Sequence, residues 1–579
     1  MRRVLLGGVA PRLPLRNSGV SIARRAFALP AAEPAFSLDA VVSREDPFLL
    51  LDGAVVNGNC KHGELTTPGM LEYERHGAKP SPSPPQHFSE ISSSQGAKGF
   101  PNVNARYRAD DKEPLPLLKE NRPAAGAGKE HWKEEWGEVD LHRAVEDHVM
   151  LTWGTSAPAI DLPHIVKGEG VYLWDSKGNK YLDWTSQAIC CNLGHDVPPA
   201  VVEAVRKQME DCFYVYGGLG IVPVRARLSK LMAQLMPGDI TGFLFPCGGA
   251  EANEAAIRIA RRYTGRQKIL TQYRSYHGGT AQSLGATGDF RRWFTEQGVN
   301  GFVKIFNPQP MGFSWGSSDE EATALALKVL EEQILLEGPA SIAAIMLESI
   351  VGAGGVLVPP AGYMEGVRAL CDKYNVLLIL DEVMAGFGRT GELWAFEHFE
   401  NVIPDIVTSA KGLTGAMLPL SMVGVREKLR KWFLDQPLGW GATYHAHPVA
   451  MACAYETVKF TVSQELPHRA RQLQVVMMEE IEQLVQKHPS VKQGRAIGLF
   501  GCIDLQGADG KAISQLGTDA PHLKAFRRAL LDNGIMSLFR PPLLHCCPPL
   551  VITEPELRDG FQRLSSALAM LDESLLGRD

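Results

Sequence analysis

The chain has 579 residues, more than one ordinary hydrophobic core accommodates, so we expect two folded domains and an additional N-terminal segment. Hydrophobic residues make up 45% and charged residues 21%, as in soluble globular proteins and unlike disordered, fibrous or membrane-embedded chains. The 59 basic and 65 acidic residues give a net charge of −6, too small and too mixed in sign to indicate a nucleic-acid or anionic-membrane partner. No apolar run approaches the ~20 residues that span a bilayer. A small-molecule substrate is the remaining expectation.

The first 32 residues carry six arginines and no acidic residue before Glu33. That composition is typical of an organelle transit peptide. Arginines and prolines interrupt every apolar stretch, so a secretory signal is disfavoured and mitochondrial import is favoured, with a plastid address as the alternative. We therefore expect residues 1–35 to be a mitochondrial targeting peptide.

Residues 36–138 contain a Pro/Ser run at 80–85 and an Ala/Gly/Pro run at 123–128. Such segments bury little apolar surface, and we expect an extension or linker of low order that contributes no chemistry.

After Trp136, short apolar runs alternate with helical patterns up to the C-terminus. Runs of this kind suit strands buried on both faces of a largely parallel sheet covered by helices, an α/β fold. The pattern Ser318-x-x-Glu321 predicts a helix that begins there and ends near Gly338. Ligands of such folds bind beyond the carboxyl ends of the strands. The predicted strands are residues 242–245, 268–272, 343–347, 376–380, 405–408 and 421–425.

Two loops follow predicted strands and contain groups that bind cofactors. In Pro246-Cys-Gly-Gly-Ala-Glu-Ala-Asn-Glu254 a glycine turn enters a helix, whose free N-H groups at Gly249 and Ala250 can hold a phosphate. In Tyr276-His-Gly278 the rings of Tyr276 or His277 can stack on a flat cofactor. Considered alone, the glycine segment can equally be a tight turn with no ligand, and Tyr276 and His277 can equally be aromatic side chains of a surface loop.

Three charged residues follow two buried strands further along the chain. Asp381 and Glu382 come directly after an apolar strand and need a partner, which can be Mg²⁺ or a protonated nitrogen base. No glycine-rich loop with a following Lys-Ser or Lys-Thr accompanies them, which disfavours the Mg²⁺ reading. In Asp405-Ile-Val-Thr-Ser-Ala-Lys-Gly412 a strand delivers Lys411 into a turn of small residues, which suits an amine that binds an aldehyde covalently.

From about Leu141 to Leu576 the sequence resembles the class III aminotransferases of pyridoxal-phosphate fold type I. The resemblance implies pyridoxal 5′-phosphate as cofactor, with Lys411 attached to it and Asp381 at its ring nitrogen. It also implies a large domain with a mostly parallel seven-stranded sheet and a smaller α+β domain built from both ends of the chain. The matching segments are Gly248-Gly-Ala-Glu-Ala-Asn-Glu254, Tyr276-His-Gly278, Gly354-Gly-Val-Leu-Val-Pro-Pro360, Asp381-Glu-Val383, Gly386-Phe-Gly-Arg-Thr-Gly391, Ala410-Lys-Gly412 and Thr443-Tyr-His-Ala-His-Pro448.

The same resemblance implies a homodimer with shared active sites. Thr443 then reaches the cofactor phosphate of the neighbouring subunit, and Val383 packs against the cofactor ring. The expected boundaries are residues 139–195 and 456–579 for the smaller domain and 196–455 for the large cofactor-binding domain.

Within the family, the sequence is most similar to taurine-pyruvate and related omega-aminotransferases, through Gln272-Tyr-Arg-Ser-Tyr-His277, Thr287-Gly-Asp289 and Arg291-Arg-Trp293. Ala353 stands where other branches carry a glutamate that toggles with a substrate arginine. Arg540 lies near the position of a mobile arginine in many omega-aminotransferases and is our candidate for the substrate acid group. Ile189, where relatives have a pocket tryptophan, and Tyr216 are further substrate-binding candidates.

The expected reaction moves an amino group from an amine or omega-amino acid, such as taurine or β-alanine, to an oxo acid such as pyruvate. Lys411 then holds the cofactor and moves the substrate proton, while Asp381 keeps the cofactor ring protonated. Two alternatives stay open, an isomerase or decarboxylase on the same fold and a catalytically silent cofactor-binding protein, because a fold does not determine a reaction.

The ten cysteines include two adjacent pairs, Cys190/Cys191 and Cys546/Cys547, and no Cys-x-x-Cys pair. The spacing does not suggest a structural zinc site, and we expect free, mostly buried thiols and no metal.

Overall fold

The computed structural model describes residues 137–153, 162–294, 300–310, 314–514 and 521–575. All of them lie in one compact unit that spans residues 132–579. The expected targeting peptide, residues 1–35, and all but the last two residues of the expected extension, 36–138, lie outside the described residues. No helix within the described ranges combines the length and the apolar character that a membrane crossing requires.

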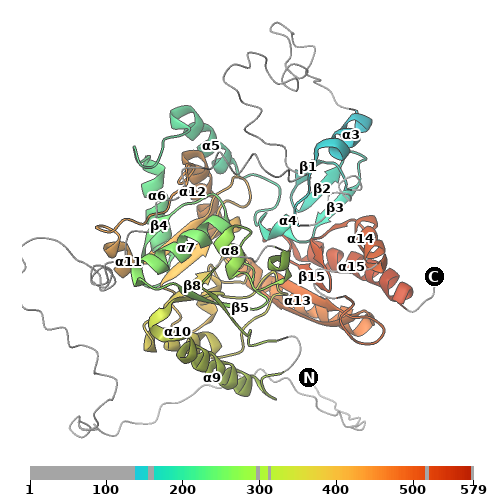
Figure 1. The fold of residues 1–579 in the computed structure, drawn as a ribbon. Helices are drawn as coiled ribbons and strands as arrows, with labels where there is room; N and C mark the ends of the chain where they lie inside the picture. Colours follow the sequence, from blue (N-terminus) through green and yellow to red (C-terminus); the bar gives the residue numbers. More distant parts are fainter. Residues whose placement is uncertain (1–136, 154–161, 295–299, 311–313, 515–520, 576–579) are drawn as a thin grey trace, which may run out of the picture. The chain divides into compact units, whose positions relative to one another are not determined.

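Within the described ranges, a seven-stranded sheet lies at the centre of the unit (Figure 1), in the order β4-β10-β9-β8-β7-β5-β6. Strand β10 is antiparallel to both of its neighbours, whereas the pairs from β9 to β6 are all parallel. The mostly parallel sheet that the sequence predicts is therefore confirmed. Its strands are β4 (Ile240–Leu244), β5 (Lys268–Gln272), β6 (Phe302–Ile305), β7 (Ile342–Glu348), β8 (Leu377–Asp381), β9 (Ile406–Ser409) and β10 (Met422–Arg426).

Both faces of this sheet are buried, and alternate residues of each strand belong to different cores. In β8, Leu378 and Leu380 pack into the core on one face, and Leu377 and Ile379 into the core on the other. Side chains alternate across a strand, so Asp381, at the end of β8, lies on the same face as Leu377 and Ile379. This alternation decides which carboxylate reaches the site described below.

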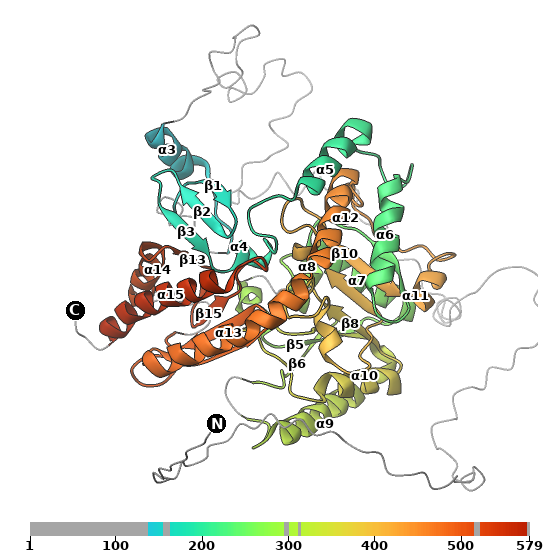
Figure 2. The same cartoon turned by 180° about the vertical axis from the view of Figure 1, so that it is seen from behind.

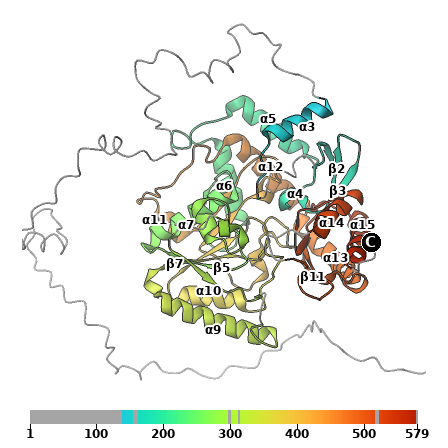
Figure 3. The same cartoon turned by 45° about the vertical axis from the view of Figure 1, so that its right-hand side comes forward.

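Helices cover the two faces. Helix α7 packs on the face toward which Asp381 points, and α9 and α10 lie together on the opposite side (Figure 3). The helices around the sheet are α5 (Pro199–Cys212), α6 (Pro223–Leu235), α7 (Gly249–Thr264), α8 (Ala281–Ala286), α9 (Asp319–Glu337), α10 (Tyr363–Lys373), α11 (Glu427–Trp432) and α12 (Pro448–Ser463), with short 3-10 helices η4 (Phe290–Phe294), η5 (Pro339–Ser341), η6 (Ala395–His398) and η7 (Lys411–Leu413).

A smaller α+β part joins the two ends of the described chain, as the family resemblance implies. Strand β13 pairs in parallel with β3, although more than 300 residues separate them. Helices α13 and α15 lie side by side, and α15 also contacts β13 (Figure 2). Its elements are α3 (Glu138–His148), β1 (Ile165–Glu169), β2 (Tyr172–Asp175), β3 (Lys180–Asp183), α4 (Ser186–Ile189), α13 (Leu466–Lys487), β11 (Val491–Ile497), β12 (Phe500–Leu505), α14 (Pro521–Asp532), β13 (Ile535–Met536), β14 (Phe539–Arg540), β15 (Leu543–Cys546) and α15 (Glu554–Leu575).

All six predicted strands are present, with ends that differ by at most two residues from the prediction. The predicted helix at Ser318 is α9, where the Ser318 side chain accepts the backbone N-H of Glu321 at 3.3 Å and Gly338 caps the C-terminus. The Glu321 carboxylate accepts from Ser317 instead of the Ser318 N-H, so only half of the predicted capping box forms.

Candidate active site

Helix α7 begins with a turn that can hold an anion. Its N-cap residue is Gly248, which supplies no side-chain cap, and Gly249 and Ala250 form the first helical positions. Backbone N-H groups in the first turn have no partner within a helix and carry the positive end of its dipole. The N-H groups of Gly249 and Ala250 are therefore available to donate to a phosphate oxygen, as predicted.

The loop after β5 lies directly against this turn. A Cβ added to Gly278 would lie 2.6 Å from the Cβ of Ala250, and the φ of Gly278 is +141°. Only glycine combines this backbone conformation with so close an approach. The loop thereby brings Tyr276 and His277 to the first turn of α7.

Asp381 is the centre of a buried hydrogen-bond network. Its Oδ2 accepts from Asn253 Nδ2 at 2.7 Å and lies 2.8 Å from His277 Nδ1, and its Oδ1 accepts from the Val383 N-H at 2.9 Å. Asn253 in turn accepts from Thr408 Oγ1 at 2.7 Å. Strands β8 and β9, helix α7 and the Tyr276 loop together hold this carboxylate in one orientation.

Glu382, the neighbour of Asp381, points to the opposite side of the sheet. Its carboxylate accepts the backbone N-H groups of Ala395 at 2.8 Å and Phe396 at 3.0 Å and also contacts Ser349. Burial raises the pKa of Glu382 to about 7. Of the two adjacent acids, only Asp381 faces helix α7, as the alternation of β8 requires.

Glu348 is a second buried acid beside Asp381 and is not among the site residues predicted from the sequence. Strand pairing places Glu348 opposite Asp381, and its carboxylate accepts the N-H groups of Tyr276 at 2.9 Å and Gly352 at 2.8 Å. Burial raises the pKa of Glu348 to about 7, and Asp381 adds to the rise. The signal available in the sequence is that Glu348 directly follows the apolar run at residues 343–347.

Lys411 follows β9 with a φ of +34°. Its ammonium group makes no hydrogen bond or ion pair within the described part of the chain. Burial lowers the pKa of Lys411 to about 8, a nearby Cys190 opposes this shift, and Arg540 adds to it. A partly buried amine of this kind is neutral, and hence nucleophilic, far more often than a solvated lysine.

A cleft of about 180 Å³ collects most of the predicted cofactor residues. Seven of them line it, and five further residues complete the lining. The seven are Gly249, Ala250, Tyr276, His277, Asp381, Val383 and Lys411, and the five are Asn253, Gly278, Glu348, Ala353 and Met384.

Arg540 lies beside the cleft and not in its lining. It lines a narrow crevice that shares Ala353 with the cleft, together with Asp289 and Arg291. Burial lowers the pKa of Arg540 to about 10, and Arg291 lowers it further. Ile189, in contrast, is 2% exposed and packs in a hydrophobic cluster, so its side chain does not line the cleft.

Thr443 and Tyr216 are exposed and do not line the cleft. The Thr443 carbonyl accepts from Tyr214 Oη at 2.7 Å, and the next carbonyl, that of Tyr444, lies 3.7 Å from Cys247 Sγ. The Thr443 segment is thus close to the glycine turn of α7, on an exposed surface.

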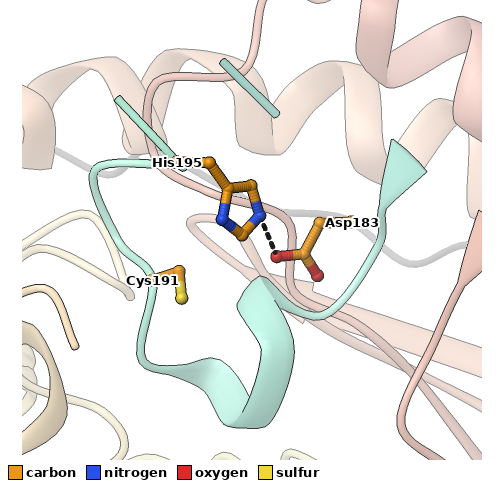
Figure 4. Close-up of side chains that lie close together, drawn as sticks. All are labelled: Asp183, Cys191 and His195. Atoms are coloured by element: carbon orange, nitrogen blue, oxygen red, sulfur yellow. Dashed lines mark hydrogen bonds and ion pairs between the residues drawn. The ribbon is translucent and has the colours of Figure 1, made fainter. Parts of the chain in front are cut away.

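A separate group consists of Asp183, Cys191 and His195 (Figure 4). Among the described residues it is the one group of three potential metal ligands, with ligand atoms within 4.8 Å of one another. Asp183 Oδ2 lies 3.0 Å from His195 Nε2, and Asp183 Oδ1 accepts the Gln187 N-H at 2.8 Å. Both carboxylate oxygens of Asp183 therefore make hydrogen bonds, which hold the segment from Asp183 to His195 in place.

Residues 156–568 match the family model described as aminotransferase class-III. The chain is 33% identical over 427 residues to a taurine-pyruvate aminotransferase of Bilophila wadsworthia, covering 70% of this chain and 92% of that protein. It is 31% identical over 404 residues to a putrescine-pyruvate aminotransferase of Pseudomonas aeruginosa, covering 68% and 87%.

A solved structure with a similar fold is the taurine:2-oxoglutarate aminotransferase of Bifidobacterium kashiwanohense in complex with PLP and glutamate. The TM-score is 0.72 and the identity 37%, over 76% of this chain and 100% of that one. The family match spans most of the chain and includes the cleft and every motif that lines it. This protein therefore belongs to the class III aminotransferase family.

Proposed function

We propose that this aminotransferase uses pyridoxal phosphate to move an amino group from an amine or omega-amino acid to an oxo acid such as pyruvate. The observation that carries the proposal is the single cleft in which the Lys411 amine, the Asp381 carboxylate and the first turn of α7 meet. The chemistry of each of these groups matches one part of the cofactor.

The residues of the cleft fit pyridoxal phosphate. The first turn of α7 offers N-H groups to a phosphate, and Asp381 offers a carboxylate to a ring nitrogen. His277 Nε2 is buried without a hydrogen-bond partner in the described structure, so a ligand atom is its available partner.

Each side chain then has a defined task. The bound cofactor supplies an aldehyde carbon that links to amines and a protonated ring that withdraws electrons from the reacting bond. Asp381 holds the proton on the ring nitrogen, and His277 and Asn253 hold Asp381 in place. Lys411 Nζ moves the proton at the amine-bearing carbon of the substrate, and a pKa of about 8 keeps part of it in the basic form near neutral pH.

Arg540 is our candidate for the substrate acid group. Its guanidinium makes no hydrogen bond or ion pair with the residues that the structure describes, and it is close enough to Lys411 to lower the pKa of that amine. An unpaired, largely buried guanidinium is a strong binding site for a carboxylate or sulfonate. The names of the relatives point to taurine, putrescine and pyruvate as substrates to test first.

The test is a pair of half-reactions with purified, cofactor-loaded protein. Adding taurine, β-alanine or putrescine should convert the absorbance of the bound cofactor, and adding pyruvate should restore it and release alanine. Lys411→Ala should abolish both changes. An isomerase or decarboxylase would turn over without an oxo acid, and a silent protein would show no spectral change; either result would refute the proposal.

We also propose a homodimer in which Thr443 completes the site of the other subunit. Support comes from exposed apolar side chains in two segments that a hydrogen bond from Tyr214 Oη to the Thr443 carbonyl brings together. In these segments Phe213, Leu219, Ile221 and Tyr444 are each more than 60% exposed. Large apolar side chains exposed near one another commonly mark a protein interface.

Finally, we propose mitochondrial import directed by residues 1–35. Six arginines ahead of the first acidic residue support this. A fluorescent protein fused to residues 1–35 should colocalise with mitochondria, and the same fusion with the six arginines changed to glutamine should not. Plastid, secreted or diffuse fluorescence of the first fusion would contradict the proposal.

A further inference from the structure

Beside the cleft lie two neighbouring arginines, Arg291 and Arg540. Arg291 is held in a buried ion pair with Asp289. Arg291 Nε donates to Asp289 Oδ2 at 2.9 Å and Oδ1 at 3.1 Å, Nη2 also contacts Oδ2, and the Arg291 N-H donates to Oδ1 at 3.0 Å. The two side chains are only 7% and 6% exposed. A pair so buried and so fully hydrogen-bonded is costly to separate, because either charge left alone loses both its partner and its water.

Arg291 of this ion pair also contacts a residue that lines the cleft. The guanidinium carbon of Arg291 lies 3.5 Å from the centroid of the Tyr276 ring, and Tyr276 lines the cleft. Arg291 is thus within reach of a substrate that extends past Tyr276, but its charge is already neutralised by Asp289.

The other arginines of the crevice differ in what they can offer. Arg274 donates Nη1 to the Gln309 carbonyl at 3.0 Å and Nη2 to the Gly354 carbonyl at 2.8 Å. Arg540 has no hydrogen-bond or ion-pair partner among the described residues. Both terminal nitrogens of Arg274 are thus taken by backbone carbonyls, and only its buried Nε lacks a partner. Arg540 is therefore the arginine of this crevice whose terminal nitrogens are available to an incoming acid.

We propose that Asp289 is a specificity-determining residue: by neutralising Arg291 it leaves Arg540 to bind one acid group, so that the site favours monocarboxylic over dicarboxylic oxo acids. The inference rests on the proposed function, in which an oxo acid is the amino acceptor. The relatives named above divide on this point, since two are named for pyruvate and one for 2-oxoglutarate.

The physical reason is that the Asp289–Arg291 pair has no net charge to offer a second acid group. A dicarboxylate that Arg540 holds through one end, and whose other end reaches toward Arg291, meets a guanidinium already paired with Asp289. That second carboxylate loses water without gaining an unpaired cation, so it adds no affinity and is disfavoured. Removing the charge of Asp289 while keeping its shape frees Arg291 for that second group.

The experiment compares two unreactive acids that differ only in a second carboxylate, pentanoate and glutarate. Their Kd values are measured by calorimetry on the cofactor-loaded protein and on Asp289→Asn. The wild-type protein should bind glutarate no more tightly than pentanoate. In Asp289→Asn, glutarate should tighten about tenfold or more while pentanoate changes less than about threefold.

Three further variants test whether the gain for glutarate comes from the lost charge of Asp289, whether it needs Arg291, and whether Arg540 binds both acids. Asp289→Glu keeps the charge and should keep the wild-type preference. Adding Arg291→Gln to Asp289→Asn should remove the gain for glutarate, and Arg540→Ala should weaken both acids. In turnover, Asp289→Asn should shift the ratio of kcat/KM for 2-oxoglutarate over 2-oxopentanoate in the same direction.

Two results would overturn the inference: wild-type protein that binds glutarate tenfold more tightly than pentanoate, or an Asp289→Asn variant that alters both acids equally. The first needs no variant, so it remains decisive if Asp289→Asn does not fold. Binding by calorimetry needs no turnover, so failure of every amine donor would refute the proposed function and leave this comparison intact.

Discussion

At the scale of single residues, the adjacent acids Asp381 and Glu382 allow a matched comparison. Asp381→Asn removes the negative charge that holds the proton on the cofactor ring, and it should slow proton removal from the amine donor by several powers of ten, about 4 kcal/mol or more. Glu382→Gln, on the opposite face, should lower stability and leave the half-reaction rate within about threefold. Single-turnover absorbance with one amine donor measures both. Equal effects of the two substitutions would show that the role of Asp381 is misassigned.

The lowered pKa of Lys411 predicts how the cofactor-free protein responds to pH. Because the folded pKa is about 8 and not 10.5, the amine becomes neutral as the pH rises through about 8. At pH 7.5 about a quarter of the Lys411 amines are then neutral, against about one in a thousand for a solvated lysine. The rate of pyridoxal phosphate capture, followed by stopped-flow absorbance, should rise up to about pH 8 and then level off.

The control for this profile is Lys411→Ala, which should show no covalent capture after borohydride reduction. A capture rate that still climbs in proportion to hydroxide at pH 9.5 would mean that Lys411 titrates like an exposed lysine.

At the scale of elements, the site depends on how closely the loop after β5 approaches helix α7. Gly278→Ala places a Cβ 2.6 Å from the Cβ of Ala250 and forces alanine to a φ of +141°, so the loop should move and weaken cofactor binding at least tenfold. Gly265→Ala, at the other end of the same helix, also has a positive φ, +70°, but nothing lies within 4 Å of the added Cβ. It should cost only roughly 1–2 kcal/mol of stability and leave cofactor affinity unchanged.

Cofactor titration and thermal unfolding of the two glycine variants separate these effects. If Gly278→Ala and Gly265→Ala lose the same stability and both keep their cofactor affinity, the contact between the loop after β5 and helix α7 is not needed for cofactor binding.

At the scale of the whole molecule, the proposed dimer can be tested by subunit mixing. Lys411→Ala and Thr443→Asp should each be inactive alone, the second because its negative charge opposes the cofactor phosphate. If Thr443 acts on the other subunit, a hybrid dimer has one site with both residues intact. An equal mixture of refolded chains should then regain about a quarter of the wild-type activity, since about half of the dimers are hybrids with one working site in two. Activity that stays at background, in material that sediments as a dimer, would show that Thr443 does not act across the interface.

Features set by local sequence could be predicted without the structure. Buried strands need apolar runs, and Asp381 and Lys411 follow such runs directly, so their placement at one edge of a parallel sheet follows from the chain alone. Strand β6 was missed because it is an edge strand, only partly buried, and carries Lys304 within four residues. An edge strand has one neighbour and does not need a continuous apolar sequence.

Features that depend on distant segments were decided by the tertiary structure. Strand register placed Glu348 beside Asp381, and the pairing of β14 with β15 carried Arg540 to the crevice that holds Asp289 and Arg291. The sequence by itself determined the family, the cofactor chemistry and the residues that carry it, because each depends on a short motif at the end of one element. Which charges remain free to meet a substrate depends on through-space pairing of residues far apart in the chain, and only the folded arrangement decided that.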